Sequence, residues 1–499
     1  MKLHFEPFYQ NYLDALGAYH LALNTLSFEQ MTFAPKKGIP YSNEALSILS
    51  QQAFEIENNP NLLKQIEDYA KTIDKNSLEY KELSYRLTRI DDMKNVPSDI
   101  YAKYVKTQAD SDMVWHEAKE TNDYELFKPY LKAVMEQTLD IISYSKRYTG
   151  DSYAIALDQF EQGMTEEKYD QFFNVIKERL VPFIQKVKNS PNQIDDTILH
   201  TPISCQRQEH FMQRVMDTLK IDPTRVYLST TEHPFTSFFS HDDVRITTHY
   251  YPDQFLSAIL STVHEYGHAL YGLQMDKAFD RTMLIEAVGS AAHESQSRLL
   301  ENHVGRSYSF WKYLYPTFIE EFPEFSEISL DDFYKMINKA EGSLIRTEAD
   351  ELTYSLHILI RYEIEKEIAK KTVNYDTLPE LWADKYEQYL GVRPKDYTTG
   401  ILQDTHWADG LFGYFPTYAL GSAMAAQIFE AMKQEINVDK ALEEGHFEII
   451  RDWLAEHVHR YAASKTMMEI VEEVSHKPFD PNIYVDYLID KYSKIYDLD

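Results

Sequence analysis

The chain has 499 residues, of which 43% are hydrophobic and 14% aromatic, a composition typical of a folded globular protein and not of a disordered one. Its formal net charge of -30 argues against nucleic acid and anionic membrane surfaces as partners, because both attract basic proteins. The single cysteine, Cys205, excludes an internal disulfide and a thiolate metal cluster, so we expect a cytoplasmic protein.

The distribution of residue types favours long helices in a water-soluble fold. There are only 15 Gly and 19 Pro, which are the residues that most often interrupt helices. No apolar run approaches the roughly 18 residues of a membrane span. Residues 1–10 are polar and lack the apolar centre of a signal peptide.

The first 150 residues show the pattern of several amphipathic helices, with leucines such as Leu13 and Leu16 near helical spacing. Pro97 and Ser98 predict a helix start with Ser98 as its N-cap, and Thr165 predicts another. The charged and tyrosine residues here are most simply solvated faces and core stripes, so we place no chemistry in this part.

After residue 225 the apolar pattern changes to alternation. Residues 226–230 and 244–248 each predict a short strand, and His233 lies in the segment between them. An edge strand of such a small sheet can pair with an extended peptide.

The pattern His-Glu-x-x-His at residues 264–268 lies in an apolar run that predicts a helix from about residue 253 to 274. Positions i and i+4 share one face of a helix, so His264 and His268 can bind one metal ion. Glu265 lies about 100° round the helix, where it can accept a proton from a metal-bound water. Two structural histidines are the alternative, but buried histidines need partners, and a metal supplies one.

A zinc site that keeps a position for water needs a third protein ligand. Glu286, Glu294 and Glu301 are the candidates, and the local sequence does not decide among them. The small residues at 289–292 would let the following helix approach the metal helix closely, which favours Glu294.

A mostly apolar helical run from residue 343 to 363 carries several charged side chains, which a core helix tolerates only when they are paired or face a cleft. Arg346 could face a cleft. A structural network of ion pairs is the alternative, and Asp350, Arg361 and Glu363 fit that alternative best.

Residues 391–421 combine glycines, a proline and aromatic residues, which indicates an irregular segment lining a cavity. His406 and Tyr418, or Tyr414 in place of Tyr418, could donate a hydrogen bond to the oxyanion of a tetrahedral intermediate. Buried tyrosines bonded to backbone carbonyls are the alternative. Residues 422–499 predict helices with no separate chemistry.

Six motifs follow one another in the middle of the chain. They are His233-Pro234-Phe235, Asp243-x-Arg245-x-Thr247, His264-Glu265-x-x-His268, His293-Glu294-Ser295-Gln296, Ile345-Arg346-x-x-Ala349-Asp350 and Gly400-x-x-Gln403-Asp404-x-His406-Trp407. With these motifs the chain resembles the Taq-type (thermostable) zinc metallocarboxypeptidase family.

The resemblance implies an almost all-helical, two-lobed fold with a deep central groove, like that of neurolysin and angiotensin-converting enzyme. We expect one peptidase domain over residues 1–499, with a small β-sheet beside the metal helix. The resemblance also implies His264, His268 and Glu294 as metal ligands, Glu265 as general base and acid, and a homodimer.

We therefore predict a carboxypeptidase with one Zn²⁺ per chain, for which Co²⁺ or Mn²⁺ could substitute, acting on peptides with a free C-terminus. Arg346 is the first choice for binding the substrate carboxylate, because a guanidinium can hold a carboxylate through two hydrogen bonds. Arg245 would serve the same purpose or brace the sheet, and His233 is assigned to substrate binding. The rival functions are a zinc oligoendopeptidase or dipeptidyl carboxypeptidase on the same fold, and a non-catalytic peptide-binding protein.

Overall fold

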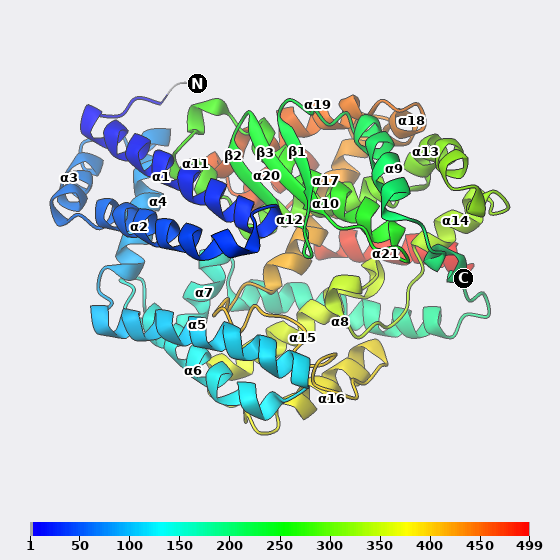
Figure 1. Cartoon of the computed structure of the whole chain (residues 1–499), viewed down its shortest axis with the longest axis horizontal. Coiled ribbons are helices and arrows are strands. Elements are labelled where there is room, and N and C mark those ends of the chain that lie inside the picture. Colours follow the sequence, from blue (N-terminus) through cyan, green and yellow to red (C-terminus); the bar gives the residue numbers. More distant parts are fainter. Residues whose placement is uncertain (1–2, 499) are drawn as a thin grey trace.

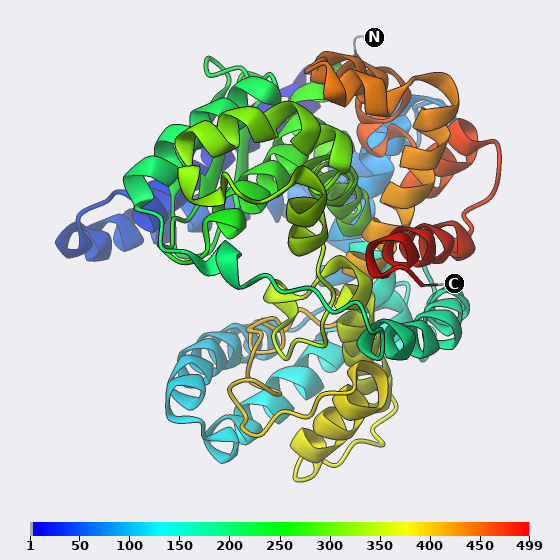
Figure 2. The same ribbon diagram turned by 90° about the vertical axis from the view of Figure 1, so that its right-hand side faces the viewer.

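The computed structural model describes residues 3–498, which form an almost entirely helical protein with one three-stranded sheet. Met1 and Lys2, the first two of the polar residues 1–10, lie outside the described residues. The helices gather into two lobes, which Figure 2 shows one above the other. The predicted class, a mostly helical two-lobed fold with one small sheet, is confirmed.

One lobe contains the sheet and combines helices from the beginning, middle and end of the chain (Figure 1). Its helices are α1 (Pro7–Thr32), α2 (Ile39–Glu57), α3 (Pro60–Ala70), α4 (Leu78–Met93), α9 (Cys205–Thr218), α10 (Phe255–Gln274), α11 (Met283–Glu286), α12 (Ser290–Arg298), α13 (Tyr308–Glu321), α14 (Leu330–Ile337), α17 (Pro416–Glu435), α18 (Val438–Glu443), α19 (Phe447–His457), α20 (Met467–Ser475) and α21 (Pro481–Tyr496).

The second lobe is built from two stretches that lie far apart in the sequence. Its helices are α5 (Ser98–Thr121), α6 (Tyr124–Ser143), α7 (Ser152–Phe160), α8 (Glu166–Lys188), α15 (Glu351–Ala369) and α16 (Leu378–Leu390). The lobes are joined where α8 packs on α21 and α15 packs on α17.

The predicted helix starts differ in outcome. Thr165 caps α8 as expected, since its hydroxyl accepts a hydrogen bond from the amide of Lys168 at 3.3 Å. The prediction of Ser98 as an N-cap was wrong, because Ser98 is the first residue of α5 and the extended residue before the helix is Pro97. No side chain caps α5, whose first backbone hydrogen bond runs from the amide of Tyr101 to the carbonyl oxygen of Pro97 at 2.9 Å.

The sheet has the strand order β1-β3-β2, with β1 (Val226–Thr230) parallel and β2 (Thr236–Ser240) antiparallel to β3 (Asp243–Thr248). The two predicted strands are confirmed as β1 and β3. The middle segment, predicted only as a connection, forms the edge strand β2. Its side chains do not alternate between buried and exposed, so it lacks the pattern by which strands are recognised.

Helix α10 lies at the centre of the sheet-containing lobe. It begins at Phe255, two residues later than predicted, and is buried on most of its surface. It packs on α12 and against strands β2 and β3. In the part of the chain from residue 3 to 498, no helix has the length and apolarity needed to cross a membrane.

Candidate metal centre

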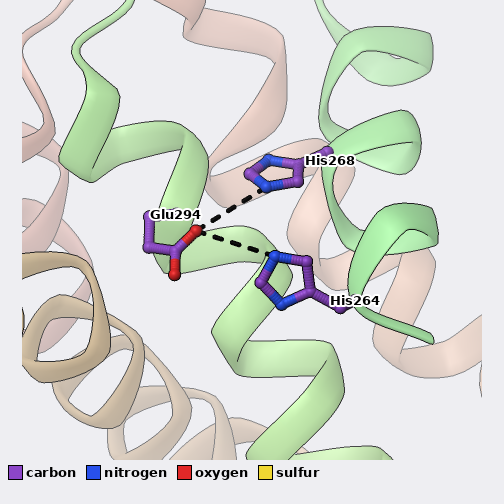
Figure 3. A group of neighbouring side chains, drawn as sticks. All are labelled: His264, His268 and Glu294. Carbon is purple, nitrogen blue, oxygen red and sulfur yellow. Dashed lines mark ion pairs between the residues drawn. The ribbon is translucent and has the colours of Figure 1, made fainter. Parts of the chain in front are cut away.

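Two histidines of α10 and one glutamate of α12 point their polar atoms at one another (Figure 3). Nε2 of His264 lies 3.8 Å and Nε2 of His268 3.7 Å from the same oxygen, Oε2 of Glu294. The three atoms all lie within 4.8 Å of one another, and no other such group of three His, Cys, Asp or Glu occurs among residues 3–498. The imidazoles are half-buried, so the group can be reached from solvent.

The donor set fits a divalent transition metal. Ligand atoms bound to zinc at about 2.0–2.2 Å in a tetrahedral arrangement are roughly 3.4 Å apart, close to the two distances observed here. Two imidazole nitrogens and one carboxylate oxygen are ligands that zinc, cobalt and manganese accept. They would leave a coordination position for water, as catalytic zinc sites do.

Close helix packing at two glycines holds the third donor in place. A Cβ atom at Gly267 of α10 would lie 2.5 Å from Cα of Ser297. A Cβ atom at Gly421 of α17 would lie 2.8 Å from Cβ of Glu294. The absence of these side chains lets α12 fit between α10 and α17, so Glu294 reaches the two histidines.

The N-terminus of α12 is held by a residue that we did not single out from the sequence, Glu161. Its buried carboxylate accepts hydrogen bonds from the backbone amides of Ala291 at 2.9 Å and Ala292 at 3.3 Å. Burial raises the pKa of Glu161 to about 7, against the effect of these hydrogen bonds. Glu161 lies 130 residues before Ala291, so no local pattern could have identified this contact.

Glu301, one of the three candidate ligands, is not among the three converging residues, but it contacts one of them, His264. It lies in a π-helical segment, Leu299–Gly305, and its Oε2 is 2.9 Å from Nδ1 of His264. Burial would raise its pKa, but Arg298 and His264 hold that pKa well below its usual range. Glu301 is therefore an acceptor, Nδ1 of His264 donates to it, and Nε2 stays free for a metal.

Arg298 connects the two carboxylates behind the metal group. Its Nε donates to Oε1 of Glu294 at 2.7 Å, and its NH1 donates to Oε2 of Glu301 at 3.1 Å. The guanidinium also stacks 4.0 Å from the ring centre of Tyr354. One oxygen of Glu294 is thus held by Arg298, while the other faces the histidines. The spacing of four residues from Glu294 is the sequence signal for this contact.

Glu286, the remaining candidate ligand, lies outside the group. It belongs to the separate short helix α11 and forms ion pairs with Arg89 at 3.0 Å and with His20 at 3.9 Å.

Glu265 lies on α10 beside the two histidines and is buried, with 7% of its surface exposed. Burial raises its pKa above the usual value, while the neighbouring His264 and the hydrogen bond from Thr236 lower it. Its Oε2 accepts a hydrogen bond of 2.6 Å from the hydroxyl of Thr236 on strand β2. Thr236 directly follows the His-Pro-Phe motif, but nothing in the sequence distinguished it from other strand threonines.

The three residues predicted to stabilise an oxyanion lie together. Nε2 of His406 is 3.1 Å from the hydroxyl of Tyr418, and the rings of Tyr414 and Tyr418 are 5.2 Å apart. Burial lowers the pKa of His406 to about 4, so the imidazole is neutral near pH 7. Burial raises the pKa of Tyr418 well above its usual value. Tyr418 lies on α17, which packs against α12, the helix that carries Glu294.

Arg346 lies beside this aromatic cluster, with its guanidinium 5.0 Å from the ring centre of Tyr418. Its Nε and NH2 donate to Asp404, and its NH1 donates to the hydroxyl of Tyr354 at 3.3 Å. Asp404 is shared with the buried Arg361. The ion pairs expected as an alternative therefore exist, and they include Arg346 itself.

The other charged residues of the same helical run also have partners. Asp350 caps α15, since its carboxylate accepts a hydrogen bond from the amide of Thr353 at 3.0 Å. Glu363 pairs with Lys177 at 3.0 Å and Lys385 at 2.7 Å.

The two remaining predicted residues lie in or beside the sheet. Arg245 pairs with Asp243 of its own strand through two hydrogen bonds of 3.0 and 2.9 Å, and its guanidinium lies 4.2 Å from the ring centre of Phe239. These contacts favour the second of the two roles predicted for Arg245, which is to brace the sheet. His233 is exposed in the turn before β2, where its carbonyl oxygen accepts a hydrogen bond from Thr231.

Comparison with known proteins gives consistent results along the chain. Residues 8–492 match the sequence profile of a family described as carboxypeptidase Taq (M32) metallopeptidase. Carboxypeptidase 1 of Bacillus subtilis is 36% identical over 500 residues, covering 99% of this chain and 100% of that protein. Thermostable carboxypeptidase 1 of Thermus thermophilus is 33% identical over 510 residues, covering 98% and 99%. The crystal structure of an M32 carboxypeptidase from Deinococcus radiodurans superposes with a TM-score of 0.93 at 28% identity, covering 99% and 100%.

Proposed function

Because this chain belongs to the carboxypeptidase Taq (M32) family of metallopeptidases, it is a metal-dependent carboxypeptidase, and we propose that it works through zinc held by His264, His268 and Glu294. The observation that carries the proposal is the convergence of these three donors beside Glu265. Cobalt or manganese would be accepted by the same atoms.

Zinc bound there would lower the pKa of its water and polarise the carbonyl of the scissile peptide bond. Glu265 takes the proton from the attacking water and passes it to the leaving amine, a role that its raised pKa supports. Once substrate replaces the hydrogen bond between them, Nε2 of His406 and the hydroxyl of Tyr418 donate to the carbonyl oxygen as it gains negative charge, with Tyr414 beside them.

We assign the substrate carboxylate to Arg346. Asp404 orients its guanidinium through Nε and NH2, and NH1, on a hydrogen bond of 3.3 Å to Tyr354, is the group left to bind a second anion. Arg245 is the second choice for binding this carboxylate, although its pairing with Asp243 favours a bracing role in the sheet. His233, exposed just before strand β2, is proposed to contact the substrate.

Replacing Arg346 by Ala is expected to lower kcat/KM for a peptide with a free C-terminal carboxylate by about 10–100-fold, the range for a lost hydrogen bond to a charged group. The same peptide with a C-terminal amide should change by less than about threefold, because it lacks the charge. Arg361 still pairs with Asp404 in this variant. Equal losses on acid and amide would contradict the assignment.

Product analysis tests the function as a whole. Mass spectrometry of a peptide digest should show single C-terminal residues released stepwise, abolished by a chelator and restored by zinc. Internal fragments would indicate an oligoendopeptidase, release of residues in pairs a dipeptidyl carboxypeptidase, and an intact peptide with zinc present a binding protein.

The proposal extends to assembly and location. We propose that residues 1–499 form a single peptidase domain that assembles as a homodimer in the cytoplasm. The region of α1 and α2 supports an interface between two copies, because it exposes apolar side chains on both helices and just after α1 that a partner could cover. These side chains are Leu21, Met31, Phe33, Tyr41, Ile48 and Phe54.

A further inference from the structure

We propose that Thr236 is a positioning residue for Glu265: its hydroxyl holds one carboxylate oxygen so that the other is aimed at the attacking water. This inference rests on the proposed role of Glu265 as general base, and it adds a residue of strand β2 to the machinery of the reaction.

The hydrogen bond from Thr236 to the carboxylate of Glu265 is short. Oγ1 of Thr236 lies 2.6 Å from Oε2 of Glu265 and 3.0 Å from its backbone oxygen. A hydroxyl has one proton, so it is donated to the nearer and charged oxygen. Within residues 3–498 Thr236 is the one side chain that donates a hydrogen bond to the Glu265 carboxylate.

The close packing of strand β2 on helix α10 explains why the hydroxyl of Thr236 reaches Glu265. Thr236 and Phe238 are two residues apart on β2 and face the same side, towards α10. Phe238 lies over Gly272, where a Cβ atom would be 2.7 Å from its ring. Gly272 is two helical turns beyond Glu265 on the same face. The missing side chain therefore lets β2 lie close to α10, and Thr236 meets Glu265.

A fixed carboxylate matters because a general base must lie within hydrogen-bond reach of the proton that it takes. Glu265 has three rotatable side-chain bonds, and a buried carboxylate without a partner would sample several orientations. Threonine suits the task, since branching at Cβ restricts its own rotation and favours a strand. With Oε2 held by Thr236, Oε1 is the oxygen available to water.

The decisive variant is Thr236→Val, which keeps the branched shape and removes only the hydroxyl. We expect kcat to fall about tenfold, the low end of the effect of a hydrogen bond to a charged group, with KM within about twofold. Zinc affinity, measured by competition with a chromophoric chelator, should not change. Thr236→Ser, which restores the hydroxyl, should recover at least about half of kcat.

Thr248 offers a matched control. It lies on the neighbouring strand β3, and its hydroxyl bonds the backbone oxygen of Ala258 in the same helix α10 at 3.0 Å. Thr248→Val therefore removes a sheet-to-helix hydrogen bond without touching Glu265, and kcat should stay within about twofold of the unmodified enzyme.

Four results would overturn the inference: unchanged kcat in Thr236→Val, loss of zinc in that variant, no recovery in Thr236→Ser, or an equal loss of kcat in Thr248→Val. The variant Glu265→Gln separates this inference from the proposed function. If Glu265→Gln is inactive while Thr236→Val is fully active, only the role of Thr236 fails. If Glu265→Gln is active, both fail.

Discussion

Replacing Glu265 by Gln is expected to lower kcat about a thousandfold while zinc remains bound. Gln keeps the size of the side chain and can still hydrogen-bond Thr236, but it cannot accept a proton. General acid–base catalysis contributes roughly 10²–10⁴-fold, and Glu265 is the proposed base for attack and the proposed acid for departure of the amine. The measurement is kcat at saturating peptide, together with the zinc content of the purified variant.

Zinc content is the control that gives this result its meaning. Glu265 is not one of the three converging donors, so the Gln variant should bind one zinc per chain with unchanged affinity. An active variant would remove the assignment of the base. An inactive variant without zinc would instead indicate that Glu265 maintains the metal site.

Replacing Glu294 by Ala should abolish both metal binding and activity. Removing a residue that only orients a ligand typically costs 10–100-fold in metal affinity, so removal of a direct ligand should cost more than about 100-fold. The loss also leaves Nε of Arg298 without its carboxylate partner. Chelator competition measures the affinity, and the zinc content of the dialysed protein gives an independent value.

Glu286→Ala is the matched control, because it removes a glutamate from the same stretch of sequence that is ion-paired with Arg89 at the surface. It should bind zinc like the unmodified protein. Full zinc occupancy in Glu294→Ala would contradict the proposed ligand set, and loss of zinc in Glu286→Ala would return that residue to the candidates.

Features that depend on local periodicity could be predicted from the sequence. The apolar run around residues 264–268 defines α10 to within two residues, because burial of this helix imposes its spacing on the chain. The alternation at residues 226–230 likewise marks β1. Strand β2 escaped prediction because its position depends on contacts with β3 and α10, and its half-buried side chains carry no period.

The third ligand could not be chosen among Glu286, Glu294 and Glu301 from their spacing along the sequence alone. The chain leaves its helical path between α11 and α12, which separates Glu286 from Glu294. A π-helical turn after α12 then directs Glu301 to the far nitrogen of His264. Neither irregularity leaves a mark in the pattern of apolar residues, so the sequence favoured Glu294 through the small residues at 289–292 but did not exclude the other two.

Contacts between segments that lie far apart in the sequence could not be predicted either. Glu161 binds the start of α12, and Thr236 binds Glu265, through hydrogen bonds that span 130 and 29 residues. Arg346 was recognised as a candidate, but its bond to Asp404 depends on the fold bringing two loops together. Partners of this kind are set by three-dimensional packing, which composition and spacing do not encode.

At Gly267 and Gly421 the helices around the three donors pack so closely that there is no room for a Cβ atom. Moving Glu294 away from the two histidines would therefore require whole helices to separate, against the surrounding core. Any redesign that changes the spacing of the three donors would have to begin at those glycine contacts and not at the donors themselves.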